Sequence, residues 1–496
     1  MSVESVALLV TLVTAGAFAM LGLVRASQQT INLEDYMVSR NRFGPWMSFA
    51  TVVASALGVW ILFSPPQVGA SSGIAGIVGY CLGSAAPLAL FTQIGPRLRQ
   101  ILPQGHSLNE FVLYRFGNAM YLLALGVIVF YMFIYLAAEL TAIAKAVQIL
   151  ADVPLGWTAL LVITATFVYT TYGGLGATIF TDAIQFAVMV PLLLVSFIVA
   201  LVAMGGWETA LQPVRLNAPQ LLSLANVDGI KFGATLVLAI IAAEVFNQAN
   251  WQRVYASRTD KTVQQSFLGS AVITLPLLLV AGSLGLLAAS QGFTDDRAFF
   301  SLLQELALPL WFTILVLVLA LALVMSTLSS LLNGIASVFT IDLIRLFPQM
   351  QTSGLLRASR LLTVAVGLPA IAIAAQGFDV LYLFLLADLV CAGAVFPVVW
   401  GLYSRRLTGQ TAFLSALAGI GAGALFFPQP DFTPWVNLPF AGDLLVSFAV
   451  AIAVSTLAAL VGSAIAPRDT QFDFATLGDR SHAYAAPAPD QISIGK

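Results

Sequence analysis

Long apolar stretches alternate with short polar segments along nearly the whole chain, and most of the stretches are long enough to cross a lipid bilayer. About 20 consecutive apolar residues span the hydrocarbon core as an α-helix. The pattern predicts helices at 4–24, 46–64, 73–93, 117–148, 155–174, 183–204, 231–250, 266–289, 309–336, 358–376, 379–402, 410–427 and 441–465. We therefore expect an all-α integral membrane protein with about 13 transmembrane helices.

Composition agrees with this reading. Hydrophobic residues make up 59% of the chain and charged residues only 9%, whereas soluble domains carry about 25% charged residues. The lipid bilayer is therefore an expected partner, while nucleic acid and an obligatory protein partner are not indicated. Cys81 and Cys391 lie inside apolar stretches, where packing is the favoured role.

Positive charge predicts the orientation in the membrane. All but four of the 21 Lys and Arg residues, Arg253 included, fall in segments that would share one side if the spans alternate. Cytoplasmic loops carry such an excess, so we expect a multi-pass protein of the cell (plasma or inner) membrane, with its N-terminus outside and its C-terminus cytoplasmic. Residues 1–30 hold a retained peripheral helix, and 467–496, with an Ala-Pro-Ala-Pro-Asp run, are expected to be a disordered cytoplasmic tail.

The second span has features of a broken helix. Gly58 and its small neighbours lower helix propensity in mid-membrane, and Pro65 and Pro66 remove amide donors further along. A broken helix frees carbonyl oxygens, which can bind a cation where they line a cavity. The alternative is close helix packing through small residues.

The ninth span carries a face of hydroxyl groups. Ser326, Ser329, Ser330 and Asn333 share one side of a helix, with Thr327 at its edge. Hard cations such as sodium prefer oxygen ligands of this kind. Alternatively, each hydroxyl bonds the carbonyl one turn back along its own helix.

Four carboxylates, Glu139, Asp182, Glu244 and Asp388, lie in or at the edge of apolar spans. Each costs about 2.5–3.5 kcal/mol on insertion scales, so such groups usually face a polar pathway. Asp182 has an alternative role in the first turn of a helix capped by Thr181. Glu139 has an alternative partner in Lys145, and Glu244 could instead pair with a neighbouring helix.

The segment Gly-Gly-x-x-Ala-x-x-x-Thr-Asp-x-x-Gln at 173–185 closely resembles the signature of the sodium:solute symporter family. Asp35-Tyr36, Ala54-Ser55, Gln252-Arg253 and the run 325–329 extend the resemblance. It implies a LeuT-type core within 31–405, built from two inverted five-helix repeats at 46–204 and 231–402. Two peripheral C-terminal helices would occupy 406–466.

The resemblance also implies binding residues. A sodium site would use the backbone carbonyls of Ala54, Leu57 and Leu323 with the side chains of Ser326 and Thr327, and a second sodium would match Asp182, Ser329 and Ser330. Some relatives carry an Asp where this chain has Ala56. Glu244, Asn247, Gln248 and Trp251 form an i, i+3, i+4, i+7 stripe on the helix predicted to border the substrate cavity, so the candidate cavity residues are Glu244, Asn247, Gln248, Glu139 and Asp388.

Taken together, these features predict a sodium-coupled secondary active transporter that imports a small polar organic solute by alternating access. Na⁺ is the expected coupling ion, and extra acids in the cavity would suit a cationic or strongly hydrogen-bonding solute. An enzyme is not expected, because no nucleophile–base arrangement or paired metal motif is present in the sequence. The alternatives are a transporter-like solute sensor and a proton-coupled symporter of the urea or polyamine type.

Overall fold

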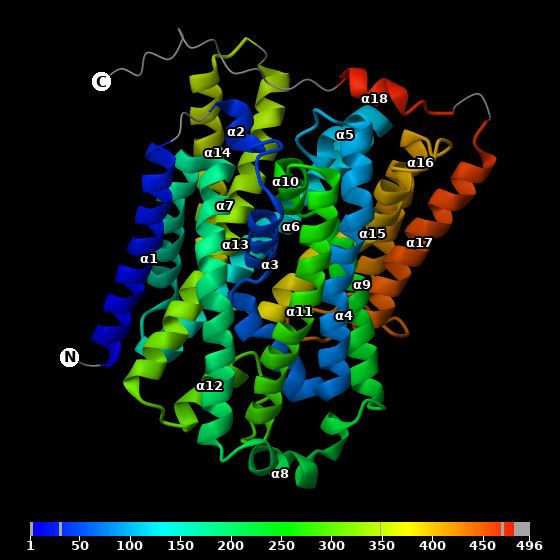
Figure 1. The fold of residues 1–496 in the computed structure, drawn as a ribbon. Coiled ribbons are helices and arrows are strands. Elements are labelled where there is room, and N and C mark those ends of the chain that lie inside the picture. The colour runs from blue at the N-terminus through cyan, green and yellow to red at the C-terminus, as the bar shows by residue number, and fades with distance from the viewer. Residues whose placement is uncertain (1–2, 29–31, 348, 468–470, 481–496) are drawn as a thin grey trace.

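The computed structural model describes residues 3–28, 32–347, 349–467 and 471–480, and its named elements are all helical. Figure 1 shows the helices gathered into one upright bundle. In chain order they are α1 (Val3–Ser27), α2 (Leu33–Met37), α3 (Pro45–Ala56), the 3₁₀ turn η1 (Val59–Leu62), α4 (Ser64–Ile101), α5 (Leu108–Phe116), α6 (Asn118–Ala151), α7 (Leu155–Ala203), α8 (Trp207–Asn217), the 3₁₀ turn η2 (Pro219–Leu222), α9 (Val227–Val245), α10 (Gln248–Ala256), α11 (Asp260–Ala289), α12 (Ala298–Glu305), α13 (Leu310–Leu346), α14 (Thr352–Ala374), α15 (Val380–Gly401), α16 (Gly409–Ala424), α17 (Leu444–Ile465) and α18 (Ala475–Arg480).

Within the described residues, nine helices are long and apolar enough to cross a membrane, or ten if the bent pair of α9 and α10 forms one span. The prediction of an all-α membrane protein is confirmed, but the expected count of about 13 spans is not. The difference has two causes. The single element α7 contains two predicted spans, and α3 and α16, with 12 and 16 residues, are short for a span.

Gly174 divides α7, because its φ of 57° and ψ of −161° are not helical. The first half of α7 lies along α1: Trp157 shares a pocket lining with Leu8, and a Cβ at Gly22 would approach Tyr169 to 2.6 Å. A straight helix of 49 residues would measure about 74 Å, more than twice the hydrocarbon thickness of about 30 Å. Glycine suits this position for two reasons: its φ is positive, and the Cβ of any other residue would lie 2.8 Å from the Tyr36 side chain. The turn at Gly174 separates the spans predicted at 155–174 and 183–204.

The predicted break in the second span is also confirmed. α3 ends at Ala56, Leu57 and Gly58 adopt extended conformations, and η1 follows. Glu139 of α6 reaches this break, where its carboxylate accepts hydrogen bonds from the amides of Val59 at 2.9 Å and Trp60 at 3.4 Å. The carboxylate thus satisfies amide groups that a helix start leaves without partners.

A second break separates α9 from α10, which meet at a bend of 56°. The sequence predicted one continuous helix at 231–250, and this prediction is wrong. Asn247 ends the continuity by acting as the N-cap of α10, where its side chain accepts from the amide of Ala249 at 3.1 Å.

The centre of the bundle is α13, in which 83% of the most apolar 18-residue window is buried, against 33% for α1 and 28% for α17. Helices α1 and α17 therefore present most of their apolar surface outward, as expected for peripheral helices in lipid. The hydroxyl-rich turn at Ser326–Ser330 lies in the buried part of α13.

The prediction of a disordered tail from residue 467 is wrong for residues 471–480. Phe472 and Phe474 contact the guanidinium of Arg115, whose central carbon lies 4.3 and 5.8 Å from the two ring centroids. Phe472 also donates its amide to the carbonyl of Arg405 at 2.8 Å. These aromatic contacts anchor the short α18 to the bundle, while the Ala-Pro run at 486–490 lies outside the described residues.

Candidate functional site

The two segments that carry the predicted sodium ligands, the broken span and α13, pack against each other. Leu57 makes the last helical bond of α3, from its amide to the carbonyl of Val53 at 2.9 Å. The carbonyls of the final turn of a helix have no amide partner within that helix. The carbonyls of Ala54 and Leu57 are in this position. On α13, the hydroxyl of Thr327 is buried and has no hydrogen-bond partner among the described residues.

Asp182 joins the two sides of this region. Its Oδ2 accepts from the Thr51 hydroxyl of α3 at 2.5 Å, and its Oδ1 accepts from the Ser326 hydroxyl of α13 at 2.8 Å. Thr51 lies one turn before Ala54, and Ser326 precedes Thr327. One carboxylate therefore holds the end of α3 beside the hydroxyl-rich turn of α13.

Asp182 is not a helix cap, because it lies inside α7, eight residues beyond the break at Gly174. Thr181, the expected cap, donates its hydroxyl to the carbonyl of Thr178 at 3.0 Å. The capping interpretation of Asp182 is therefore wrong.

The second predicted sodium position contains a side chain of the protein. The Nη2 of Arg253, on α10, donates to Asp182 at 2.8 Å and to the Ser330 hydroxyl at 2.6 Å. Ser329 turns away and donates to the carbonyl of Ser326 at 2.9 Å. The structure thus brings Asp182 and Ser330 together around a guanidinium and leaves Ser329 in a bond along its own helix.

Sequence reasoning missed the parts that Thr51 and Arg253 play in this cluster. Arg253 was assigned to the inner surface by charge counting, yet its side chain is wholly buried. A signal was available in Gln252-Arg253, which the sequence analysis noted as part of the resemblance without giving the arginine a partner.

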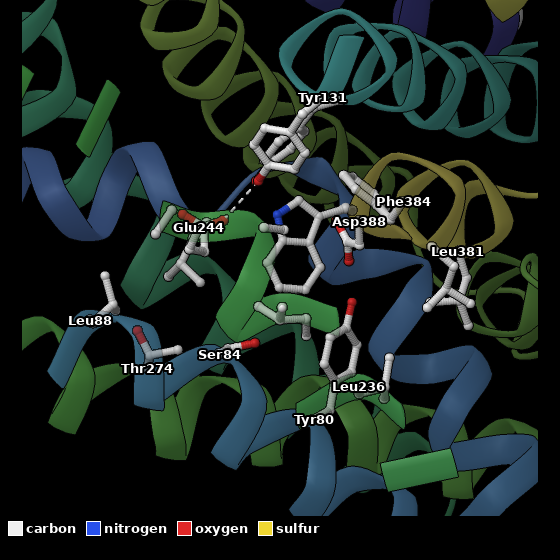
Figure 2. A pocket seen from close by; sticks show the side chains of 17 residues that line it. Tyr80, Ser84, Leu88, Tyr131, Leu236, Glu244, Thr274, Leu381, Phe384 and Asp388 are labelled. Carbon is white, nitrogen blue, oxygen red and sulfur yellow. Dashed lines mark hydrogen bonds between the residues drawn. The ribbon is translucent and has the colours of Figure 1, made fainter. Parts of the chain in front are cut away.

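A cavity of about 60 Å³ lies beside the break in the broken span, and Glu244 and Asp388 both line it. Figure 2 shows the two carboxylates on different sides of the pocket, with Tyr131, Tyr80 and Phe384 around them. Trp60 and Tyr135 complete an aromatic lining. Of the described residues that form the wall, none is Lys, Arg or His.

The two acids differ in their surroundings. Glu244 accepts from the Tyr131 hydroxyl at 3.2 Å and from the side-chain amides of Asn247 at 3.1 Å and Asn250 at 2.7 Å. Asp388 is 5% exposed, and no hydrogen-bond donor to its carboxylate is found in the part of the chain that the structure describes. Three further polar atoms of the lining, on Trp60, Ser84 and Thr274, are buried and have no hydrogen-bond partner among the described residues.

The other candidate cavity residues lie elsewhere. Gln248 donates to the carbonyl of His106 at 2.8 Å and to Ser337 at 3.4 Å, away from the cavity wall. Asn247 donates its side-chain amide to Glu244 and is not among the residues that line the cavity. Trp251 donates to the carbonyl of Val245. The stripe predicted along one helix is therefore wrong, because the break after Val245 turns its members in different directions.

Glu139 likewise does not line the cavity, since its carboxylate lies against the amides of the break. The alternative pairing of Glu139 with Lys145 is also wrong. Lys145 instead forms an ion pair with Asp296, in the segment before α12.

Comparison with known proteins gives a consistent identification. The model of the sodium:solute symporter family matches residues 36–419. A spermidine transporter of Candida albicans is 30% identical over 74% of this chain and 70% of its own length, and a sodium/proline symporter of Escherichia coli is 27% identical over 81% and 83%. A solved Na⁺-coupled sialic acid symporter superposes with a TM-score of 0.78 at 17% identity, over 94% of this chain and 98% of that one.

The structural match shows the fold, which is that of LeuT-like transporters, and the family model shows the relationship. The expected symporter function, with Na⁺ as coupling ion, is confirmed, as is the expectation that the chain is not an enzyme. The chain belongs to the sodium:solute symporter family and is a sodium-coupled transporter of the membrane.

Proposed function

We propose that the chain imports a small organic cation, of the amine class, using one sodium ion bound between α3 and α13. The observation that carries the proposal is a cavity with two carboxylates, five aromatic side chains and no basic residue among its described lining.

The charges in the cavity favour a cation. A carboxylate inside the membrane is expensive unless a partner compensates it. Glu244 has only neutral donors, and Asp388 has no donor among the described residues. Aromatic faces attract ammonium groups by about 0.5–2 kcal/mol, so the same wall offers two kinds of contact to an amine.

The wall also suits a chain of methylene groups between charged ends. Leu236, Ile240, Leu381 and Leu385 supply apolar contact beside the acids. The spermidine transporter of Candida albicans, which is 30% identical, supports an amine as the solute class. A neutral solute would leave both carboxylates without a compensating charge.

We propose that sodium binds to the carbonyls of Ala54, Leu57 and Leu323 and to the hydroxyls of Ser326 and Thr327. The unpaired Thr327 hydroxyl supports this assignment. Ser326 supports it as well, because its hydrogen points to Asp182 and its lone pairs remain available. Five oxygens of this kind suit a hard cation.

Coupling between the two sites would run through Leu57. Its carbonyl is a proposed sodium ligand, and its side chain lines the substrate cavity together with Ala56. Sodium would hold the break in the broken span in one shape, and that shape forms part of the cavity wall. Substrate affinity would therefore depend on bound sodium, and bound substrate would change sodium affinity by the same factor.

For the topology we propose 13 crossings, with inverted repeats at 46–204 and 231–402, each beginning with a broken helix. The turn at Gly174 supports two crossings within α7. The start of α1 and the position of α18 at opposite ends of the bundle (Figure 1) support an odd number. The distribution of Lys and Arg favours an outside N-terminus and a cytoplasmic C-terminus.

A binding panel tests the solute class. Purified protein in sodium is titrated with putrescine, spermidine, proline and glucose, each competing against labelled spermidine. We expect the two amines to compete and the neutral sugar to fail. Glu208→Gln, which removes an exposed acid on α8, serves as the control for general loss of negative charge. Competition by proline with none by putrescine would contradict the proposal.

A further inference from the structure

The guanidinium of Arg253 occupies the centre of an oxygen cluster formed by three other helices. Its Nη2 lies 2.8 Å from Asp182 on α7 and 2.6 Å from Ser330 on α13, and its Nε lies 3.1 Å from the Thr51 hydroxyl of α3. Its Nη1 donates to the carbonyl of Ala249 on its own helix, at 3.0 Å. Arg253 and Asp182 are both wholly buried.

The cluster without Arg253 would have the composition of a cation site. It combines a buried carboxylate with hydroxyl oxygens, the ligand types that hard cations prefer. The resemblance to the symporter family implies a second sodium at Asp182, Ser329 and Ser330. The structure instead brings a cation of the protein itself to the same position.

A sodium ion and this guanidinium could not share the position. The two bonds of Nη2, at 2.6 and 2.8 Å, already span the space between Asp182 and Ser330. The pair of Asp182 and Arg253 is also neutral as a unit, so that an added ion would leave a net positive charge in a fully buried place. Uncompensated buried charge is strongly unfavourable.

We propose that Arg253 acts as a tethered cation at the second ion position, so that the chain binds one sodium ion per cycle and does not bind a second. The inference rests on the proposed sodium site at Ser326 and Thr327. It makes Arg253 a residue that sets ion stoichiometry and does not itself contact the solute. It also predicts that a neutral side chain at position 253 opens the cluster to a second sodium.

The test is the number of ²²Na⁺ ions bound per purified protein at saturation, with the Hill coefficient of the binding curve. Wild type should bind one ion with a Hill coefficient near one. Arg253→Gln should bind two ions, with a Hill coefficient above one. Arg253→Lys, which keeps the charge, should bind one. Arg253→Gln combined with Ser330→Ala should also bind one, because it removes a hydroxyl oxygen that would hold the extra ion.

Two ions bound by wild type would overturn the proposal, and so would an Arg253→Gln protein that still binds one. No ion bound by wild type would instead contradict the proposed sodium site. Should Arg253→Gln fail to fold in choline, its melting temperature in rising NaCl gives the same answer. A melting temperature of Arg253→Gln that rises with NaCl, while that of the double variant does not, supports a new ion site. If sodium does not raise the melting temperature of Arg253→Gln, the number of ions bound by wild type alone decides.

Discussion

Ser326 donates its hydroxyl hydrogen to Asp182 across 2.8 Å, from α13 to α7. A hydroxyl oriented in this way directs its lone pairs away from the carboxylate, where a cation can use them. Asp182 therefore positions a sodium ligand without having to contact the ion. Its own charge is balanced by Arg253, which keeps the arrangement neutral before sodium arrives.

Thr327→Val tests the sodium site with almost no change of shape. The Thr327 hydroxyl is buried without a partner among the described residues, so its loss should leave stability in sodium-free buffer unchanged or raise it by about 1 kcal/mol. The sodium concentration for half-maximal uptake should rise roughly tenfold, equivalent to about 1.4 kcal/mol. Thr327→Ser is the matched control and should resemble wild type. Identical sodium curves for Val and wild type would exclude Thr327 as a ligand.

The two cavity acids should separate in a comparison of stability with binding. Asp388→Asn removes a buried charge that has no donor among the described residues, so the melting temperature without solute should stay level or rise. Binding of an amine should nevertheless weaken at least tenfold, because a buried charge pair is lost. Thermal shift and titration on the same preparation measure both effects.

Glu244→Gln should behave differently from Asp388→Asn. Glu244 accepts three hydrogen bonds, and an amide in its place turns an acceptor into a donor that faces other donors. We expect both stability and amine binding to fall. Equal behaviour of the two variants in both measurements would contradict the distinction drawn between them.

Gly58→Ala should act by displacing Glu139. A Cβ at Gly58 would lie 2.2 Å from a carboxylate oxygen of Glu139, which would push the carboxylate off the amides of Val59 and Trp60. The expected loss of stability is about 1–3 kcal/mol, as for a buried group left unpaired. Combining Gly58→Ala with Glu139→Ala should cost less than the sum of the single changes.

Gly126→Ala on α6 is the control for this experiment, since its added Cβ would meet no atom of the other described residues within 4 Å, apart from the backbone of its own helix. Free energies that simply add in the double variant would show that Gly58 and Glu139 act independently.

His106, in the segment between α4 and α5, should make stability depend on pH. Burial lowers the pKa of its imidazole, but the hydrogen bonds and charges of Glu110 and Glu34 outweigh burial and raise that pKa above its ordinary value. A histidine whose pKa is raised by folding contributes its full stabilisation at pH values below its pKa in the unfolded chain, about 6.5. This contribution is lost as pH rises through the folded pKa.

The melting temperature should therefore fall as the pH rises above about 6.5, and less so in His106→Gln. The pKa of Glu34, despite its burial, is lowered by His106 and Arg40, so its contribution is lost only in acid, below about pH 4.5. An identical slope in wild type and variant above pH 6 would rule out His106 as the source.

Local patterns in the sequence predicted the helices, the break at Gly58 and the separation of two spans after residue 174, because each depends on residues close together in the chain. The break after Val245 has a weaker signal. No Gly or Pro marks it, and only Asn247 and Asn250 indicate a cap. Periodicity alone therefore extended one helix through it and aligned Gln248 with Glu244.

The pairing of Arg253 with Asp182 could not be predicted from such patterns, because 71 residues separate the two. Charge counting places an arginine near a helix end at the surface, and only the packing of α10 against α3 and α13 buries it. For the same reason the sequence could name Asp388 and Glu244 as buried acids but could not tell that they face one cavity.

Uptake into proteoliposomes tests the central claim most directly. Labelled spermidine is supplied outside, with an inward sodium gradient and with membrane potential and pH difference both clamped at zero. We expect accumulation above the outside concentration, which stops when choline replaces sodium and drops sharply in Asp388→Asn. Accumulation that persists in choline and follows an imposed proton gradient would contradict it.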